Sequence, residues 1–156
     1  VERARQGRLR LIGDGRNRVD VTYVEDAARA HLLAADALAL PRSPAAGRPY
    51  FLSQGEPVEL RELLAMLLRA AGLPGELRSV PVAVGHAAGH LLEALYRALP
   101  LPGEPPLTRF VAEELSTDHH FSIAAARRDL GYEPSLDVAS LARLAGASLA
   151  RDPHAA

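Results

Sequence analysis

Hydrophobic and polar residues alternate at two places in the chain and repeat with helical spacing at several others. Positions 8–13 (RLRLIG) and 19–24 (VDVTYV) alternate with a period of two, which is typical of β-strands. Within positions 48–53 (RPYFLS) three apolar residues follow one another, as in a strand covered on both faces of a parallel sheet. We therefore expect two or three short strands.

Apolar residues spaced three and four positions apart predict helices between these strands. The expected helices cover about residues 26–38, 58–71, 81–99, 107–115, 123–129 and 137–149. Asp26 is assigned as the N-cap of the first helix, and Pro41 ends that helix. The first nine residues look like the end of a helix. The apolar side of 81–99 is expected to pack against the core, and contact with a membrane surface is the alternative.

A strand, a helix and a second strand make a βαβ unit, which indicates an α/β fold. Parallel sheets usually have several strands and are covered on both faces. The chain supplies too few strands for such a sheet, so the strand at 48–53 lacks neighbours. We therefore expect the fold to be incomplete.

The composition of the 156 residues restricts the chemistry. All 18 Lys and Arg residues are arginine. Because the chain has no lysine, it can neither form a Schiff base nor carry the lysine of a P-loop. Cysteine is absent, and the net charge of -1 favours neither nucleic acid nor an anionic membrane as a partner. A cytoplasmic location is the default expectation. The six arginines within positions 3–18 allow a phosphate contact, although a solvated helix end is the simpler interpretation.

Other motifs have simple structural explanations. GDGRNR lacks the third glycine of a dinucleotide fingerprint, and GASLA lacks one glycine of a nucleophile elbow. His86, His90 and Glu93 share one helical face, but an amphipathic helix needs no metal to explain such a stripe. His119 and His120 either line a pocket or are solvated.

Residues 21–34 (VTYVEDAARAHLLA) carry a recognisable pattern. It consists of Tyr23 and Val24, then Asp26, and then Ala28, Ala30, His31 and Ala34. Together with the flanking RLRLIGDGRNRVD, RPYFLSQGEPVELRELL and ARRDLGYEP, it resembles the 3β-hydroxysteroid dehydrogenase branch of the extended short-chain dehydrogenase/reductases. Residues 101–134 are most similar to the bacterial 2-alkyl-3-oxoalkanoate reductases of olefin biosynthesis. The resemblance covers nearly the whole chain.

The resemblance implies the C-terminal portion of a Rossmann-type doubly wound sheet plus a mainly helical substrate-binding subdomain. Residues 1–80 would hold the sheet portion, residues 81–150 the subdomain, and residues 151–156 a frayed tail. Nucleotide-sugar enzymes of the superfamily place an arginine where this chain has Val19. A hydrophobic ketone, such as a 2-alkyl-3-keto acid or a sterol-like ketone, is therefore the expected substrate.

The same resemblance divides the chemistry between two halves. The cofactor turn for NAD(P) and the Tyr-x-x-x-Lys pair belong to the N-terminal Rossmann half, so this chain alone is expected to bind no cofactor and to hold no catalytic or metal-binding residue. Its implied contribution is the substrate pocket, which segments of this chain border in relatives. The candidate substrate-binding residues are Tyr23, Arg109, His119, His120 and Phe121.

Three hypotheses follow. The chain is the C-terminal fragment of an NAD(P)-dependent oxidoreductase and is inactive alone. Alternatively, it is a non-catalytic module that binds hydrophobic ligands or assembles with a partner. In the third hypothesis, it is one half of a split enzyme that a separate N-terminal chain completes.

Overall fold

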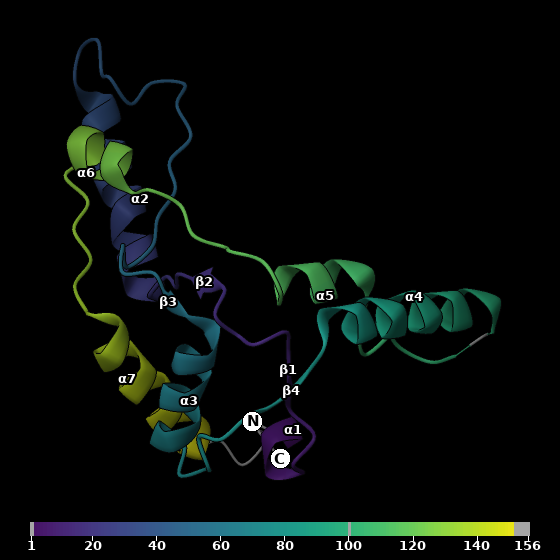
Figure 1. Ribbon diagram of the computed structural model, residues 1–156. Coiled ribbons are helices and arrows are strands. Elements are labelled where there is room, and N and C mark those ends of the chain that lie inside the picture. The colour runs from purple at the N-terminus through teal and green to yellow at the C-terminus, as the bar shows by residue number, and fades with distance from the viewer. Residues whose placement is uncertain (1, 100, 152–156) are drawn as a thin grey trace.

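The computed structural model describes residues 2–99 and 101–151, which form helices around two small sheets (Figure 1). The helices are α1 (Glu2–Arg5), α2 (Val24–Ala39), α3 (Leu60–Ala70), α4 (Val82–Ala98), α5 (Arg109–Glu114), α6 (Ala124–Leu130) and α7 (Val138–Arg151). The strands are β1 (Arg10–Ile12), β2 (Arg18–Val19), β3 (Val58–Glu59) and β4 (Arg78–Val80). The six helices expected after residue 20 are confirmed, with ends within two residues of the expected ones.

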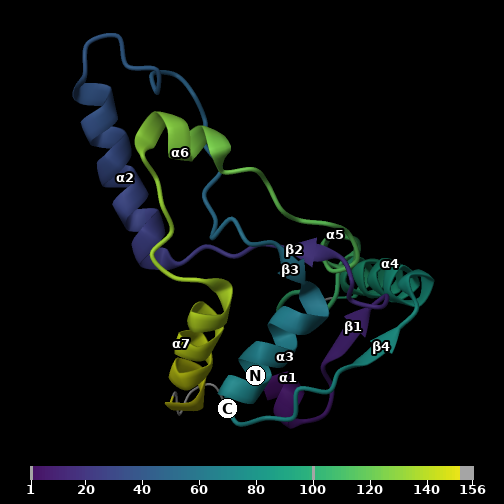
Figure 2. The same ribbon diagram turned by 60° about the vertical axis from the view of Figure 1, so that its left-hand side comes forward.

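Apart from α1, the helices gather in two groups on either side of β1 and β4 (Figures 1 and 2). One group holds α2, α6, α3 and α7, and the other holds α4 and α5. The predicted division at residue 80 falls between β4 and α4, and it stays a prediction that these are separate units. Of the predicted frayed tail, residue 151 ends α7 and residues 152–156 lie outside the described residues.

The two sheets each pair strands that are distant in the sequence. β1 runs parallel to β4, with Leu11 opposite Ser79, and this confirms the strand expected within 8–13. β2 runs antiparallel to β3, with Val19 opposite Val58, and Val19 also bridges to His119. The strand expected over 19–24 is therefore much shorter than predicted, because α2 already begins at residue 24.

The segment 48–53 was expected to be a strand covered on both faces, and this prediction was wrong within the described residues. Its side chains contact α6 and Phe121, but its backbone forms no strand ladder in the described chain: Thr22 donates a hydrogen bond to the Leu52 carbonyl, and Gln54 donates its N–H to the Val21 carbonyl. Phe51 is 58% exposed. A strand needs ladder partners to form and a covering layer to bury both faces, and the described chain supplies neither on the far side.

The main hydrophobic cluster joins α2 to α6 and to the segment that follows α6. Its buried members are Ala30, Ala45, Ile123, Ala126, Leu130 and Tyr132. A second contact joins α3 to α7, where a Cβ on Gly146 would come within 2.3 Å of the Ala70 Cβ. Gly146 lies in the GASLA motif, and its small size serves close helix packing.

Helix α4 was expected to bury its leucine-rich side, and this prediction was also wrong. Its buried residues are Gly85 and Gly89, whereas Leu91 is 69% exposed. A Cβ on Gly89 would lie within 3.0 Å of the Thr108 and Arg109 backbone, so the absence of a side chain is what allows α5 to approach. Among the described residues, no helix is both long enough and apolar enough to cross a bilayer.

Candidate functional site

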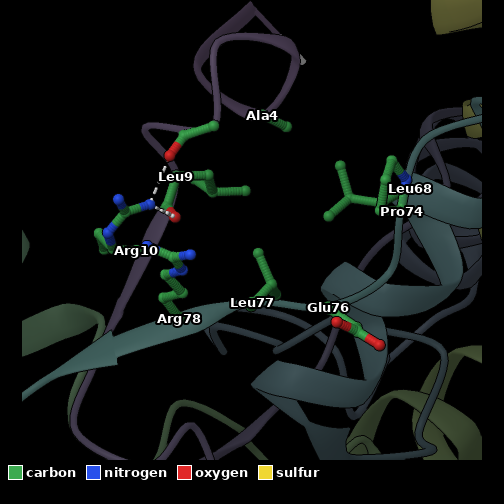
Figure 3. A pocket seen from close by; sticks show the side chains of 9 residues that line it. Ala4, Leu9, Arg10, Leu68, Pro74, Glu76, Leu77 and Arg78 are labelled. Atoms are coloured by element: carbon green, nitrogen blue, oxygen red, sulfur yellow. Dashed lines mark hydrogen bonds between the residues drawn. The ribbon is translucent and has the colours of Figure 1, made fainter.

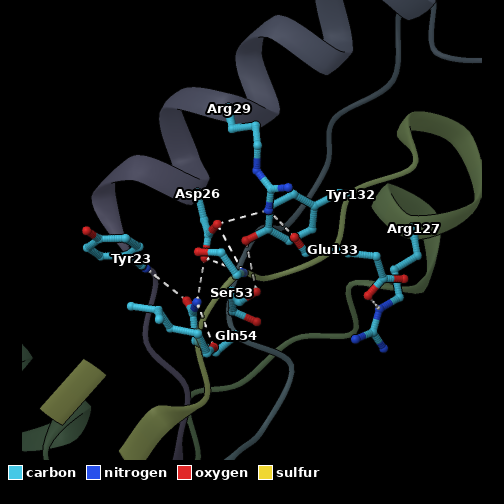
Figure 4. A network of polar contacts seen from close by, with 10 residues as sticks. Tyr23, Asp26, Arg29, Ser53, Gln54, Arg127, Tyr132 and Glu133 are labelled. Atoms are coloured by element: carbon cyan, nitrogen blue, oxygen red, sulfur yellow. Dashed lines mark hydrogen bonds and ion pairs between the residues drawn. The ribbon is translucent and has the colours of Figure 1, made fainter. Parts of the chain in front are cut away.

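A buried carboxylate at the start of α2 joins three separate parts of the chain (Figure 4). Asp26 is 1% exposed and accepts hydrogen bonds from the Gln54 amide at 2.8 Å and from the Ser135 N–H at 3.0 and 3.1 Å. Arg29 donates a further bond at 3.0 Å. The Gln54 side-chain oxygen accepts the Tyr23 N–H at 2.8 Å, so this cluster also fixes the entry to α2. We call Asp26, Gln54, Ser135 and Tyr132 the Asp26 hub.

The sequence-based assignment of Asp26 as an N-cap was wrong. Tyr23 occupies the N-cap position without a side-chain cap bond, and Asp26 lies in the first turn. Burial raises the pKa of Asp26, but the hydrogen bonds donated by Ser135, Gln54 and Arg29 outweigh this effect and lower the pKa below its ordinary value. The carboxylate therefore stays ionised and serves as a fixed acceptor.

Tyr132 completes the hub from the end of α6. Its side chain is fully buried, and its hydroxyl donates a hydrogen bond to the Ser53 carbonyl at 3.1 Å. Burial, followed by the nearby Asp26 charge, raises the pKa of Tyr132. Ser53 in turn donates to Asp20 at 2.7 Å. The segment at 53–55 is thus held in place by polar contacts from both neighbouring segments.

Tyr23, the first candidate substrate residue, lies against α7. It lines a hollow of about 430 Å³ with Leu141, Leu144 and Ala145. Burial and the adjacent Glu25 raise the pKa of Tyr23. Tyr23 is thus placed to pack against α7 or to form hydrogen bonds at this hollow.

His119, His120 and Phe121 form an extended segment beside β2. The His119 N–H donates to the Arg18 carbonyl at 2.7 Å, and its ring nitrogen lies 2.9 Å from the Glu114 carboxylate. His120 is exposed. Phe121 stacks on Phe51 with ring centroids 4.1 Å apart and planes inclined by 6°. Both rings remain more than half exposed, so together they form an apolar surface.

Arg109 is held at the start of α5 by Glu93 of α4. The Arg109 side chain lies 2.8 Å from the Glu93 carboxylate, and its backbone N–H donates to the same group at 2.7 Å. This backbone bond is the main cause of the lowered pKa of Glu93. The guanidinium charge of Arg109 is therefore already balanced within the helix pair.

The five candidate substrate residues thus lie at three places and not around one common pocket. Tyr23 faces α7, Arg109 is tied to α4, and the segment 119–121 lies beside β2 and Phe51. Their assignment to a substrate pocket stays a prediction. Phe51 was missed as a candidate because the sequence pattern placed it in a covered strand.

The residues considered for zinc have partners of other kinds. Glu93 binds Arg109, and the His86 ring lies 3.4 Å from the Glu113 carboxylate on α5. In the part of the chain that the structure describes, no three His, Asp or Glu side chains come close enough together to hold a metal ion.

Comparison with known proteins decides the family. Residues 1–82, more than half of the chain, match the 3-beta hydroxysteroid dehydrogenase/isomerase family. The chain belongs to this family. The matched region contains Asp26 and Gln54, two of the four residues of the hub, whereas Tyr132 and Ser135 lie outside it.

Two curated proteins are closely similar in sequence to this chain. The chain is 50% identical over 151 residues to a 2-alkyl-3-oxoalkanoate reductase of Stenotrophomonas maltophilia, covering 96% of this chain and 46% of that protein. It is 41% identical over 138 residues to a protein of the same name from Shewanella oneidensis, covering 88% and 36% respectively. The chain therefore spans less than half the length of these relatives.

A solved structure supports the fold class. The UDP-glucuronic acid 4-epimerase from Bacillus cereus, in complex with NAD, matches 96% of this chain and 38% of its own chain with a TM-score of 0.56 and 14% identity. This likeness concerns the fold alone. It confirms the predicted α/β class as a portion of a Rossmann-type structure.

Proposed function

We propose that this chain forms the substrate-side part of an NAD(P)-dependent oxidoreductase that acts on a hydrophobic ketone or alcohol. The observation that carries the proposal is the 50% identity, over nearly the whole chain, to a 2-alkyl-3-oxoalkanoate reductase. A 2-alkyl-3-keto acid is accordingly the proposed substrate, with a sterol-like ketone as the related alternative.

The proposal assigns the cofactor and the catalytic pair to a segment outside these 156 residues. The chain contains no lysine, so it cannot supply the Tyr-x-x-x-Lys pair that the family resemblance implies. The extended segment 48–53 forms no strand ladder within the described residues, and Phe51 is exposed there. Further strands of a Rossmann half would supply the missing neighbours.

The stacked pair of Phe51 and Phe121 supports an apolar substrate. Apolar walls with few polar groups are the usual lining of a site for such a ligand. The nearest arginine to the nucleotide-sugar position, Arg18, donates a hydrogen bond to the Pro57 carbonyl at 2.8 Å and is thus engaged within the chain. The position that carries an arginine in nucleotide-sugar enzymes is occupied by Val19, which favours an uncharged substrate end there over a diphosphate.

The test is NAD(P)H oxidation by the longest product that the gene encodes around this chain, with a long-chain 2-alkyl-3-oxoalkanoate as substrate. We expect turnover by that product and none by the 156 residues alone. Phe121→Ala should raise KM by about tenfold through lost apolar contact, and less for a short-chain analogue.

Phe110→Ala is the matched control, because Phe110 is 70% exposed on α5 and loses the same atoms. Its KM should be unchanged. Failure of the longer product to reduce any long-chain keto acid would contradict the proposed activity. Turnover by the 156 residues alone would contradict the division between the two parts.

A further inference from the structure

The parallel register of β1 and β4 places two arginines side by side. Arg10 lies opposite Arg78, and like charges in this position are destabilising (Figure 3). The Arg10 guanidinium donates hydrogen bonds to the carbonyls of Gly7 and Leu9 at 2.6 and 2.9 Å. Among the described residues, neither arginine forms an ion pair with a carboxylate.

Two further arginines next to this pair also have neutral partners. Arg8 donates to the Gln6 side chain at 3.4 Å, and Arg3 donates to the Pro106 carbonyl at 3.3 Å. Glu76 lines the hollow beside Arg10 and Arg78, but its carboxylate is directed away from both of them (Figure 3). The four arginines, which we call the arginine cluster, therefore keep their charge within the described structure.

Two hollows adjoin the arginine cluster, and Leu9 and Arg10 line both of them. The first, of about 300 Å³, is lined by Leu9, Leu68 and Leu77 together with Arg10 and Arg78 (Figure 3). The second, of about 280 Å³, is lined by Leu9, Ile12, Val80, Val84 and Leu107 and also by Arg3, Arg8 and Arg10. Positive charge and concave apolar surface thus occur together.

We propose that the arginine cluster binds the phosphate group of an amphiphile whose apolar chain lies in one of these hollows. A guanidinium donates paired hydrogen bonds to a phosphate, and a dianionic group can neutralise several arginines at once. Binding would relieve the repulsion between Arg10 and Arg78. The site is separate from Phe51 and Phe121, and it stands independently of the proposed oxidoreductase activity.

The first measurement compares dodecyl phosphate with inorganic phosphate at equal concentration and ionic strength, using the longest product that the gene encodes. We expect dodecyl phosphate to raise the melting temperature and to bind measurably in calorimetry, and inorganic phosphate to do both more weakly. Equal binding of the two probes would contradict the role of the apolar hollows. Absence of dodecyl phosphate binding would overturn the proposal.

The second measurement uses the double variant Arg10→Gln with Arg78→Gln. Its affinity for dodecyl phosphate should fall by about tenfold or more, because charge-assisted hydrogen bonds are lost. Without ligand its melting temperature should not fall, since the variant removes a like-charge pair. A structural role for the two arginines would produce the opposite result in the ligand-free protein.

Arg42→Gln with Arg97→Gln is the matched control. Both arginines are exposed and line neither hollow, and this double variant loses the same two charges. An equal loss of affinity in this variant would show that the effect depends only on net charge. It would contradict the proposed site.

The source of the phosphate is distinguished with vesicles of phosphatidylcholine with and without phosphatidic acid. Cosedimentation that requires phosphatidic acid and Arg10 with Arg78 identifies a membrane lipid as the source of the group. Binding of dodecyl phosphate without cosedimentation identifies a soluble phosphorylated amphiphile.

Discussion

The Asp26 hub and the α4–α5 helix pair place polar and apolar residues in opposite ways. In the hub, the Asp26 carboxylate is 1% exposed and accepts hydrogen bonds from the Gln54 amide and the Ser135 N–H. In the helix pair, Leu91 and Phe110 are about 70% exposed, and the contact is made by Gly89 and an ion pair at the surface. Side-chain polarity is therefore a poor guide to burial in this chain, because backbone donors and the close approach of backbone segments decide which residues are buried.

The largest effect on the free energy of unfolding is expected at the Asp26 hub. Asp26→Ala removes the acceptor for the Gln54 amide, which is buried, and for the Ser135 N–H. We expect a loss of about 3 kcal/mol in the free energy of unfolding, because buried donors are left unsatisfied. Chemical denaturation of the full-length protein measures this. Asp36→Ala on the exposed side of α2 is the control and should change stability little.

The acid dependence of stability gives a separate check on the same substitution. The folded-state pKa of Asp26 is lowered, so its contribution is fully present above the ordinary carboxyl pKa of about 4 and is lost as pH falls below that value. Asp26→Ala should therefore flatten the acid side of the stability curve. It flattens it only in part, because the pKa of Asp129 is lowered as well, by Arg128. Identical acid limbs in the two proteins would show that the hub is not formed as described.

The next largest effect is expected at the close contact between α4 and α5. In Gly89→Ala the new Cβ would lie 2.9 to 3.0 Å from the backbone at Thr108 and Arg109. Backbone cannot move aside as a flexible side chain can, so overpacking should cost about 1–2 kcal/mol even though alanine favours the helix.

Hydrogen exchange should locate this loss in α5 and leave the Asp26 hub protected. Ala87→Ser adds one atom on the exposed side of α4 and is the control. Exchange that rises equally in both regions would mean that the two regions unfold as one unit.

The helices could be predicted from the sequence because each depends on local spacing. The role of Asp26 could not, because its partners Gln54 and Ser135 are 28 and 109 positions away and the spacing at 23–26 also fits an N-cap. The orientation of α4 was predicted wrongly because a hydrophobic pattern assumes that large side chains make the contact. Here Gly85 and Gly89 make it, and the leucines point outward.

The candidate site, too, could be predicted from the sequence only in part. The family was identified correctly from residues 21–34 and their flanks, since these are contiguous motifs. The stacking of Phe121 on Phe51 joins residues 70 positions apart and has no local signal. Phe51 was instead expected to be buried, because consecutive apolar residues predict burial. They do not indicate which segment of a protein packs against them.

The smallest effect is expected at the ion pair of the helix pair. The Glu93 side chain is 18% exposed and Arg109 is 53% exposed, so solvent screens their attraction. Glu93→Gln keeps an oxygen that can still accept the Arg109 N–H, and the loss should be below about 1 kcal/mol and should shrink further at high salt. Glu104→Gln, at an exposed position in the loop between α4 and α5, is the control. A loss as large as that of Asp26→Ala would mean that the charge of Glu93 is as important to the fold as the buried carboxylate, and the contrast between the two regions would fail.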